Sequence, residues 1–494
     1  MVTAAGIIWP TGALIGVLGA VLAGASGLLW WYGDRLQHPV WRTLGANLVA
    51  VAAVAIGFGC AVALRADAVG NHPVTAALGT VAPVTVTPTE SALPVGARRL
   101  MFRATLRRLG NHEISGRVVV FAASADFGEV IVGQPVQFRA RVGRPTRRDL
   151  TVATLTATGE PTRGRAGPVH RAAHTVRARF AALAGQVLPS EQARMLPALV
   201  LGDTSAVTAA TGREFRTAGL THLMAVSGAN VTIVCGAVMF SARLIGPRAA
   251  VLLAAAALVA FVIVVQPTAS VLRAAVMGAI ALLGVLSARR RQAIPSLSAS
   301  VLVLLAVAPQ LAVDVGFALS VVATAALVVI APVWSARLVT RGWPKPLADA
   351  VCVAWAAQLV TAPLIAGISG RLSLVSAAAN LAVAALVAPI TVLGSAAAAL
   401  GVWWPAAARL LIRFTGPELW WVCRVAHWSA GVPGAAVPVP GSLAGVVGLG
   451  GAAVLAVVSW RWRWCRLGLA AVLICLLAWS LSDLLTGRAG VGAA

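Results

Sequence analysis

Residues 249–266 read Ala249-Ala-Val-Leu-Leu-Ala-Ala-Ala-Ala-Leu-Val-Ala-Phe-Val-Ile-Val-Val-Gln266 and hold no charged side chain. An apolar run of about 18 residues is long enough to cross the hydrocarbon of a bilayer as one helix. Similar runs recur along the chain of 494 residues, which is 59% hydrophobic and only 11% charged. Soluble domains carry about 25% charged residues. The sequence therefore excludes a soluble or fibrous protein and predicts a polytopic α-helical membrane protein.

The apolar runs predict about ten to twelve spans. Two open the chain, near Gly12–Trp31 and Gly45–Leu64. The others are expected near residues 220–241, 249–266, 269–287, 295–312, 314–333, 347–368, 372–402, 415–432, 443–460 and 467–485. The 372–402 run is long enough to be a broken helix. Glu418 and Arg424 interrupt the 415–432 run, so a helix lying in the interface is its alternative.

Basic residues in short loops predict the orientation of these spans. They cluster on one side if the spans alternate, at Arg35 and Arg42, Arg289 to Arg291, Arg337, Arg341 and Lys345, and Arg461, Arg463 and Arg466. Cytoplasmic loops carry the excess of basic residues, so this side is expected to be the cytoplasm. The segment between the second and third spans then lies outside.

That outer segment has a different character from the rest of the chain. Short alternating stretches bounded by Gly, Pro and Asn, such as residues 100–106, 114–122 and 136–142, are typical of antiparallel strands. Five or six such strands in a basic module favour a small OB-like β-barrel, with a generic β-sandwich as the alternative. We expect a transmembrane hairpin over 1–66, the β domain over 67–173, an amphipathic helical connector over 174–218, a membrane core over 219–486 and a tail over 487–494.

The charge balance points to a polyanionic partner. Lys and Arg number 39 against 15 Asp and Glu, which gives a net charge of +24, and Lys345 is the single lysine. Anionic lipid or nucleic acid would suit this excess, although a GC-rich genome also favours arginine. The cysteines show no paired spacing and are expected to be small buried apolar residues: Cys60, Cys235, Cys352, Cys423, Cys465 and Cys475.

Polar residues inside apolar runs are the candidate functional residues, because each is costly in a bilayer. The densest group is His222, Ser227, Gly228 and Asn230, in which His222, Val226 and Asn230 would share one face of a helix. Gly228 would permit a close approach or a break in the helix. Further along, Gln358 and Asn380 accompany a series of serines, Ser369, Ser373 and Ser376, that would form one polar stripe for helix packing or a water path.

Two charged residues stand out in the same core. Arg273 lies a few residues into a span, where it either snorkels to the interface or faces a hydrated interior, paired with a carboxylate or a phosphate. Asp314 opens the apolar run near 314–333, where it either caps a helix or pairs with a cation such as Arg273.

Missing motifs limit the chemistry. A single lysine, in Trp343-Pro-Lys345-Pro, excludes a Walker phosphate loop, and the 7 histidines do not form a metal-binding signature. We therefore expect neither a cofactor nor a metal, and no enzyme activity. An intramembrane hydrolase using Ser227 and His222 is a weak alternative, because five residues on a helix place the two side chains far apart around its axis.

The order of motifs resembles the ComEC competence family. Leu201-Gly202-Asp203 and His222-Leu-Met-Ala-Val-Ser227-Gly228-Ala-Asn230 are followed by Ser270-Val-Leu-Arg273, Asp314-Val-Gly-Phe317-Ala-Leu-Ser320, Gln358-Leu-Val-Thr361-Ala-Pro363, Asn380 and Pro389. The resemblance runs from about Thr80 to Trp460. Many members end in a metallo-β-lactamase-like domain, which we do not expect here, and Asn230 stands where the family often has His.

The resemblance implies that the protein imports single-stranded DNA across the bacterial plasma membrane. The residues expected at the DNA path or its gate are His222, Ser227, Gly228, Asn230, Arg273, Asp314, Gln358 and Asn380. The arginines expected to capture DNA on the β domain are Arg103, Arg107, Arg108, Arg117, Arg139 and Arg141. Expected partners are single-stranded DNA, the lipid bilayer, a DNA receptor, a cytoplasmic motor or ssDNA-binding protein, and a second copy of the chain. The alternative is a permease for a small solute.

Overall fold

The computed structural model describes residues 39–439 apart from 97, 146, 148, 267 and 287–292, together with the single positions 7, 24, 31, 448, 450 and 451. The spans predicted near 443–460 and 467–485, most of the first span and the tail over 487–494 lie outside these residues. The chain divides into two compact units. One comprises residues 1–174, 266–273 and 298–318, and the other comprises 175–265, 274–297 and 319–494.

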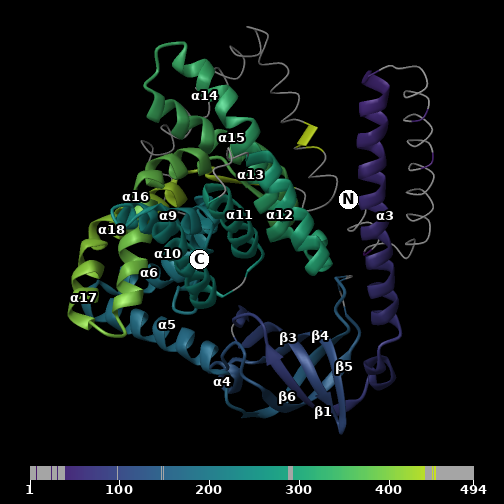
Figure 1. Ribbon diagram of the computed structural model, residues 1–494. Helices are drawn as coiled ribbons and strands as arrows, with labels where there is room; N and C mark the ends of the chain where they lie inside the picture. Colours follow the sequence, from purple (N-terminus) through teal and green to yellow (C-terminus); the bar gives the residue numbers. More distant parts are fainter. Residues whose placement is uncertain are drawn as a thin grey trace. The chain divides into compact units, whose positions relative to one another are not determined.

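The first unit contains a closed β-barrel (Figure 1). Its strands are β1 (Val81–Pro88), β2 (Leu93–Val95), β3 (Arg99–Leu109), β4 (His112–Ala123), β5 (Val136–Gly143) and β6 (Ala153–Arg163). The sheet order is β1-β5-β6-β4-β3-β2, and an additional β1–β3 pairing closes the ring. All barrel pairings are antiparallel except β4–β6. If the short β2 is set aside, the ring has the strand order of an OB fold, as the alternating sequence predicted.

The barrel forms because its strands alternate between apolar and polar side chains. On β5, Val136, Phe138, Ala140 and Val142 are buried while the residues between them are exposed. The short helix α4 (Ser124–Phe127) follows β4 and inserts Phe127 into the core, where its ring meets Phe138 edge to face at 5.1 Å. Successive side chains on a strand point to opposite faces, so one set fills the barrel and the other set is left for solvent or ligand.

Helices also belong to this unit. The helix α3 (Pro39–Gly70) leads into the barrel through the 3-10 turn η1 (Pro73–Ala77). The segment 298–318 contains the end of α12 (Ala293–Val307), the turn η2 (Pro309–Val313) and the start of α13 (Val315–Val329). Ser91, in the loop that holds β2, donates a hydrogen bond to Gln266 Oε1 at 2.7 Å, just before α11 (Ala269–Leu286).

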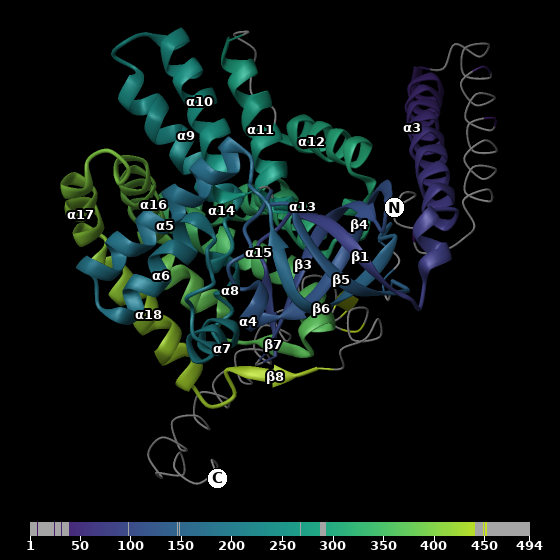
Figure 2. The same ribbon diagram turned by 90° about the horizontal axis from the view of Figure 1, so that it is seen from below.

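The second unit is helical. Its helices are α5 (Pro168–Val187, whose first turns belong to the first unit), α6 (Ser190–Leu201), α7 (Ala209–Thr217), α8 (Thr221–Met224), α9 (Gly228–Ala242), α10 (Pro247–Val265), α14 (Ala331–Val339), α15 (Lys345–Ser369), α16 (Ser376–Leu400), α17 (Pro405–Phe414) and α18 (Gly416–Gly431). A two-stranded ribbon pairs β7 (Arg371–Ser373) with β8 (Ala436–Pro438). Helix α16 contacts α6, α9, α15, α17 and α18, and α9 packs along α10 (Figure 2). Helix α16 is therefore the central helix of the unit.

Five helices among the described residues are long and apolar enough to cross a membrane: Asn47–Ala77, Pro247–Val265, Val315–Val339, Lys345–Ser369 and Ser376–Leu400. Gly228–Ala242, Ala269–Val285 and Ala293–Val307 are apolar but shorter. The chain is thus a multi-pass membrane protein with an inserted β-barrel, as predicted, while the total of ten to twelve spans stays a prediction. The α16 helix is continuous within the 372–402 run, and the helix that fills the 415–432 run, α18, is not among the candidate spans.

Candidate functional site

The segment with His222 folds as a broken helix. The chain turns at Gly219 with φ +72°, forms the single turn α8, and becomes extended at Ala225 and Ser227 before α9 begins at Gly228. A Cβ at Gly219 would lie 2.3 Å from Ser376 Oγ, so only glycine fits there. The predicted helical face of His222, Val226 and Asn230 is therefore wrong, because the helix stops between the first and the last of them.

Ser227 and Asn230 tie the start of α9 to the end of α6. The Ser227 hydroxyl donates to Asn230 Oδ1 at 3.1 Å, and Asn230 Nδ2 donates to the Leu199 carbonyl at 3.1 Å. Asn230 is buried with 4% of its surface exposed, so these bonds satisfy an amide that water does not reach. The hydroxyl of Ser227 thus bonds an amide, while His222 lies on the turn α8, beside the backbone of Gly219.

A second polar cluster joins α15 to α16. The Ser376 hydroxyl donates to Gln358 Oε1 at 2.8 Å, and Asn380 Nδ2 donates to the Ser376 carbonyl at 2.9 Å and to its hydroxyl at 3.2 Å. Gln358 Nε2 donates to the Ser373 carbonyl at 3.4 Å. The structure therefore brings two predicted path residues, Gln358 and Asn380, together on Ser376, against which Gly219 also packs.

The predicted polar stripe from Ser369 to Asn380 is interrupted. Gly370 ends α15 in the left-handed region with φ +66°, and the strand β7 separates Ser369 from α16. Only Ser376 and Asn380 share a turn of helix α16. Ser373 lies before that helix and donates to the Thr217 carbonyl at 2.7 Å. The polar residues of the predicted stripe therefore lie on different elements and form separate hydrogen bonds, because the chain reverses at Gly370.

Arg177 on α5 is a buried residue that the sequence analysis did not single out. Its Nη1 donates to the carbonyls of Leu201 at 2.9 Å, Val264 at 3.3 Å and Val265 at 3.4 Å, and its Nη2 lies 3.4 Å from Asp203 Oδ2. These carbonyls end α6 and α10, where the helix leaves them without internal donors. Desolvation, opposed by the Asp203 charge, lowers the pKa of this guanidinium. The signal in the sequence was Asp203 in the Leu-Gly-Asp motif, which needed a basic partner.

The charged candidates of the first unit lie on and beside the barrel. Asp314 caps α13, since its Oδ1 accepts the Phe317 N–H at 2.8 Å, and its Oδ2 lies 3.8 Å from Arg103 Nη2. Arg103 also donates to Glu90 at 3.2 Å. Arg273 is buried near the start of α11, with 4% of its surface exposed. The sequence left open whether Asp314 caps a helix or pairs with a cation. Its carboxylate does both, since it caps α13 and lies beside Arg103.

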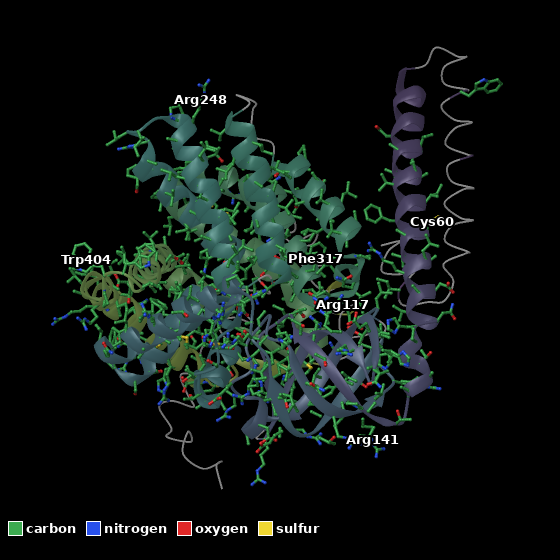
Figure 3. All side chains as sticks on the ribbon, turned by 60° about the horizontal axis from the view of Figure 1, so that its bottom comes forward. Cys60, Arg117, Arg141, Arg248, Phe317 and Trp404 are labelled. Atoms are coloured by element: carbon green, nitrogen blue, oxygen red, sulfur yellow. The ribbon has the colours of Figure 1, made fainter. Side chains whose placement is uncertain are left out.

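The other arginines predicted to capture DNA are exposed. Arg107 and Arg108 end β3, and Arg139 and Arg141 project from the outer face of β5. Figure 3 shows Arg117 and Arg141 on opposite sides of the barrel. The six arginines therefore form two groups, a half-buried pair next to carboxylates and an exposed set of four.

Comparison with known proteins addresses the helical part of the chain. The family model described as Competence protein matches residues 199–464, which is more than half of the chain. The chain belongs to the competence protein family. No metallo-β-lactamase domain is found among these matches, and no curated protein and no solved structure matches the chain.

The matched range holds all the predicted path residues of this competence protein. It begins at Leu199, whose carbonyl accepts the Asn230 amide, and includes both polar clusters together with Arg273 and Asp314. The barrel and its arginines lie before it. Within the described residues, no group of three or more His, Cys, Asp or Glu side chains is placed to hold a metal ion. The family links the chain to DNA uptake.

Proposed function

We propose that this competence protein moves single-stranded DNA across the bacterial plasma membrane during DNA uptake, as a conduit and not as an enzyme. The observation that carries the proposal is the polar cluster of Gln358, Ser376 and Asn380, which lies on apolar helices inside the matched family range. Polar groups on candidate spans are costly, and such residues commonly mark a substrate pathway.

The physical problem is the charge of the cargo. At a duplex-like rise, about nine phosphates of the strand would occupy a hydrocarbon core of about 30 Å at once. Bare phosphates in that medium are prohibitive, so the path needs water or polar groups along its length. Neutral amides and hydroxyls can bond phosphate oxygens without trapping the strand by charge. On this proposal the path or gate is formed by His222, Ser227, Gly228, Asn230, Arg273, Asp314, Gln358 and Asn380.

Capture precedes passage. The barrel lies outside the membrane in the orientation that the basic loops predict, and its arginines hold the strand by phosphate contacts that do not depend on sequence. A DNA receptor would deliver the DNA, and a cytoplasmic motor or ssDNA-binding protein would draw the strand inward. The protein's own residues supply the binding surface and the polar path.

The test is uptake of labelled duplex DNA into a nuclease-protected pool, in competent source cells with and without the gene. Loss of protected single strands, with surface-bound DNA unchanged, is the expected result. Unchanged uptake in demonstrably competent cells would contradict the proposal and favour transport of a small solute. Asn380→Leu is the matching variant, and Ser395→Ala on the same helix is its control, because the Ser395 hydroxyl is buried without a partner in the described part of the chain.

A further inference from the structure

The face of the barrel formed by β3 and β4 carries a pair of arginines. In the register of these strands Arg103 lies opposite Val119, and Arg117 lies opposite Thr105. The two arginines are therefore diagonal neighbours, and both alternate with buried residues, so they project from the outer face. In OB folds the second and third strands and the loops that join strands 1–2 and 4–5 form the ligand surface. Here β3 and β4 are those strands.

Carboxylates from three segments already face this pair. Glu90 comes from the loop after β1 and accepts from Arg103 Nη1 at 3.2 Å. Asp314 precedes α13 and lies 3.8 Å from Arg103 Nη2. Asp149 comes from the loop between β5 and β6, where its Oδ1 accepts the Thr151 N–H. Desolvation lowers the pKa of Arg103, while the charge and hydrogen bond of Glu90 and the charges of Asp314 and Asp149 raise it, with a net upward shift.

Arg117 is in the opposite situation. Its Nη1 is buried and has no acceptor among the described residues. Desolvation, followed by the neighbouring charge of Arg103, lowers the pKa of Arg117. Two guanidiniums side by side, one with a free buried donor, form a site for a single anion that bridges them. A phosphodiester has that chemistry, since its two non-bridging oxygens can accept from both arginines.

We propose that Arg103 and Arg117 bind one backbone phosphate of single-stranded DNA, and that Glu90 and Asp314 hold the site until the phosphate replaces them. This inference rests on the proposed function. Arg103 exchanges carboxylate oxygens for phosphate oxygens, and Arg117 gains an acceptor for its buried donor. Asp314 loses its cation but keeps the N–H of Phe317. The exchange therefore reaches the first turn of α13, the start of a candidate span, so that capture of DNA on the barrel changes the charge balance at the end of a membrane helix.

The experiment measures binding of a fluorescein-labelled oligothymidine by the full chain in nanodiscs of zwitterionic lipid, which keeps anionic headgroups from competing. Asp314→Asn retains helix capping, because Asn caps as well as Asp. We expect Asp314→Asn and Glu90→Gln each to tighten binding about two- to fivefold, the strength of a half-exposed ion pair. Arg117→Gln should weaken binding about tenfold and remove the gain from Asp314→Asn, because the two act on one site.

The control is Arg141→Gln, an exposed arginine on β5 across the barrel. It should weaken binding by the same factor with either residue at position 314, since distant sites add. Wild-type binding that is unchanged or weakened by Asp314→Asn and Glu90→Gln would overturn the exchange and leave the proposed function standing. Failure of the wild-type chain to bind the oligonucleotide at all would count against the proposed function itself.

Discussion

The barrel and the helical unit of this competence protein handle polarity in opposite ways. The outer face of the barrel carries full charges, with arginines on β3, β4 and β5. The polar clusters on α9, α15 and α16 are neutral, and their amides and hydroxyls bond to each other and to carbonyls. Charge attracts a polyanion at little cost where water is present, whereas in hydrocarbon a fixed charge is expensive and would hold a phosphate too firmly. On the proposed function, the charges on the barrel suit capture of the strand, and the neutral clusters suit its passage.

In the described part of the helical unit, Arg177 is the charged residue that is buried, and replacing it tests this contrast most severely. Arg177→Met removes three carbonyl bonds and leaves Asp203 without its cation. We expect the free energy of unfolding to fall by about 3–5 kcal/mol, the usual cost of breaking a buried pair. Thermal unfolding of the purified protein in detergent measures it. Arg179→Met is the matched control: this exposed arginine donates to one carbonyl, of Val402, and its loss should matter little. Equal effects of the two variants would contradict the structural role of Arg177.

Gly219→Ala is expected to cause the second largest fall in the free energy of unfolding. The new Cβ would meet Ser376 Oγ at 2.3 Å, in a backbone conformation with φ +72° that alanine avoids. We expect a loss of about 2–4 kcal/mol from strain and overpacking, read from the same unfolding curves. Ser376→Gly should restore part of this loss, because it removes the atoms that clash. Gly236→Ala in α9, where a Cβ meets nothing within 4 Å, should not destabilise the protein.

Gln358→Glu would place a charge in the neutral polar cluster around Ser376. The side chain keeps its length and its acceptor for Ser376, but the carboxylate repels phosphate and loses the donor to Ser373. We expect entry of protected DNA to fall about tenfold or more, equivalent to about 1.4 kcal/mol, with surface-bound DNA unchanged. Gln137→Glu on the exposed face of β5 serves as control. Normal DNA entry in Gln358→Glu would remove Gln358 from the proposed path.

The smallest expected effect concerns the exposed arginines. Replacing Arg139 and Arg141 with Gln together should reduce the slope of log affinity against log salt by about 1–2, because each phosphate contact releases counterions. Anisotropy of the labelled oligonucleotide at several salt concentrations gives the slope. Folding should not change, since both side chains are exposed on β5. An unchanged slope would mean that the capturing charge lies elsewhere on the protein.

Local pattern predicted the elements of both units well. The alternation over 136–142 became β5, and the apolar run over 249–266 became α10. Ring closure through β1–β3 and the parallel β4–β6 pairing could not be read from alternation, because they depend on contacts between distant segments. The family itself is indicated by short motifs that occur in order along the chain.

The candidate site was predictable as a set of residues but not as a geometry. The break between α8 and α9 was missed because its residues, Ala225 and Val226, are as apolar as the helices around them. Arg177 was missed because an arginine in an amphipathic helix usually faces water. The contact of Asp314 with Arg103 joins residues far apart in the sequence, and no local spacing predicts it. Long-range contacts therefore decide which of the polar residues act together.

The hydrogen bonds around Ser376 have a consequence for the energy supply of the cell. The amide groups of Gln358 and Asn380 and the hydroxyls of Ser373 and Ser376 find their acceptors within the protein. Donors that already have acceptors in the protein do not require water molecules as hydrogen-bond partners. A continuous chain of water molecules is what conducts protons across a membrane. On the proposed function, the resting protein can be abundant in an energised membrane without leaking protons and dissipating the proton gradient. The same bonds must then open only when a strand arrives to replace them.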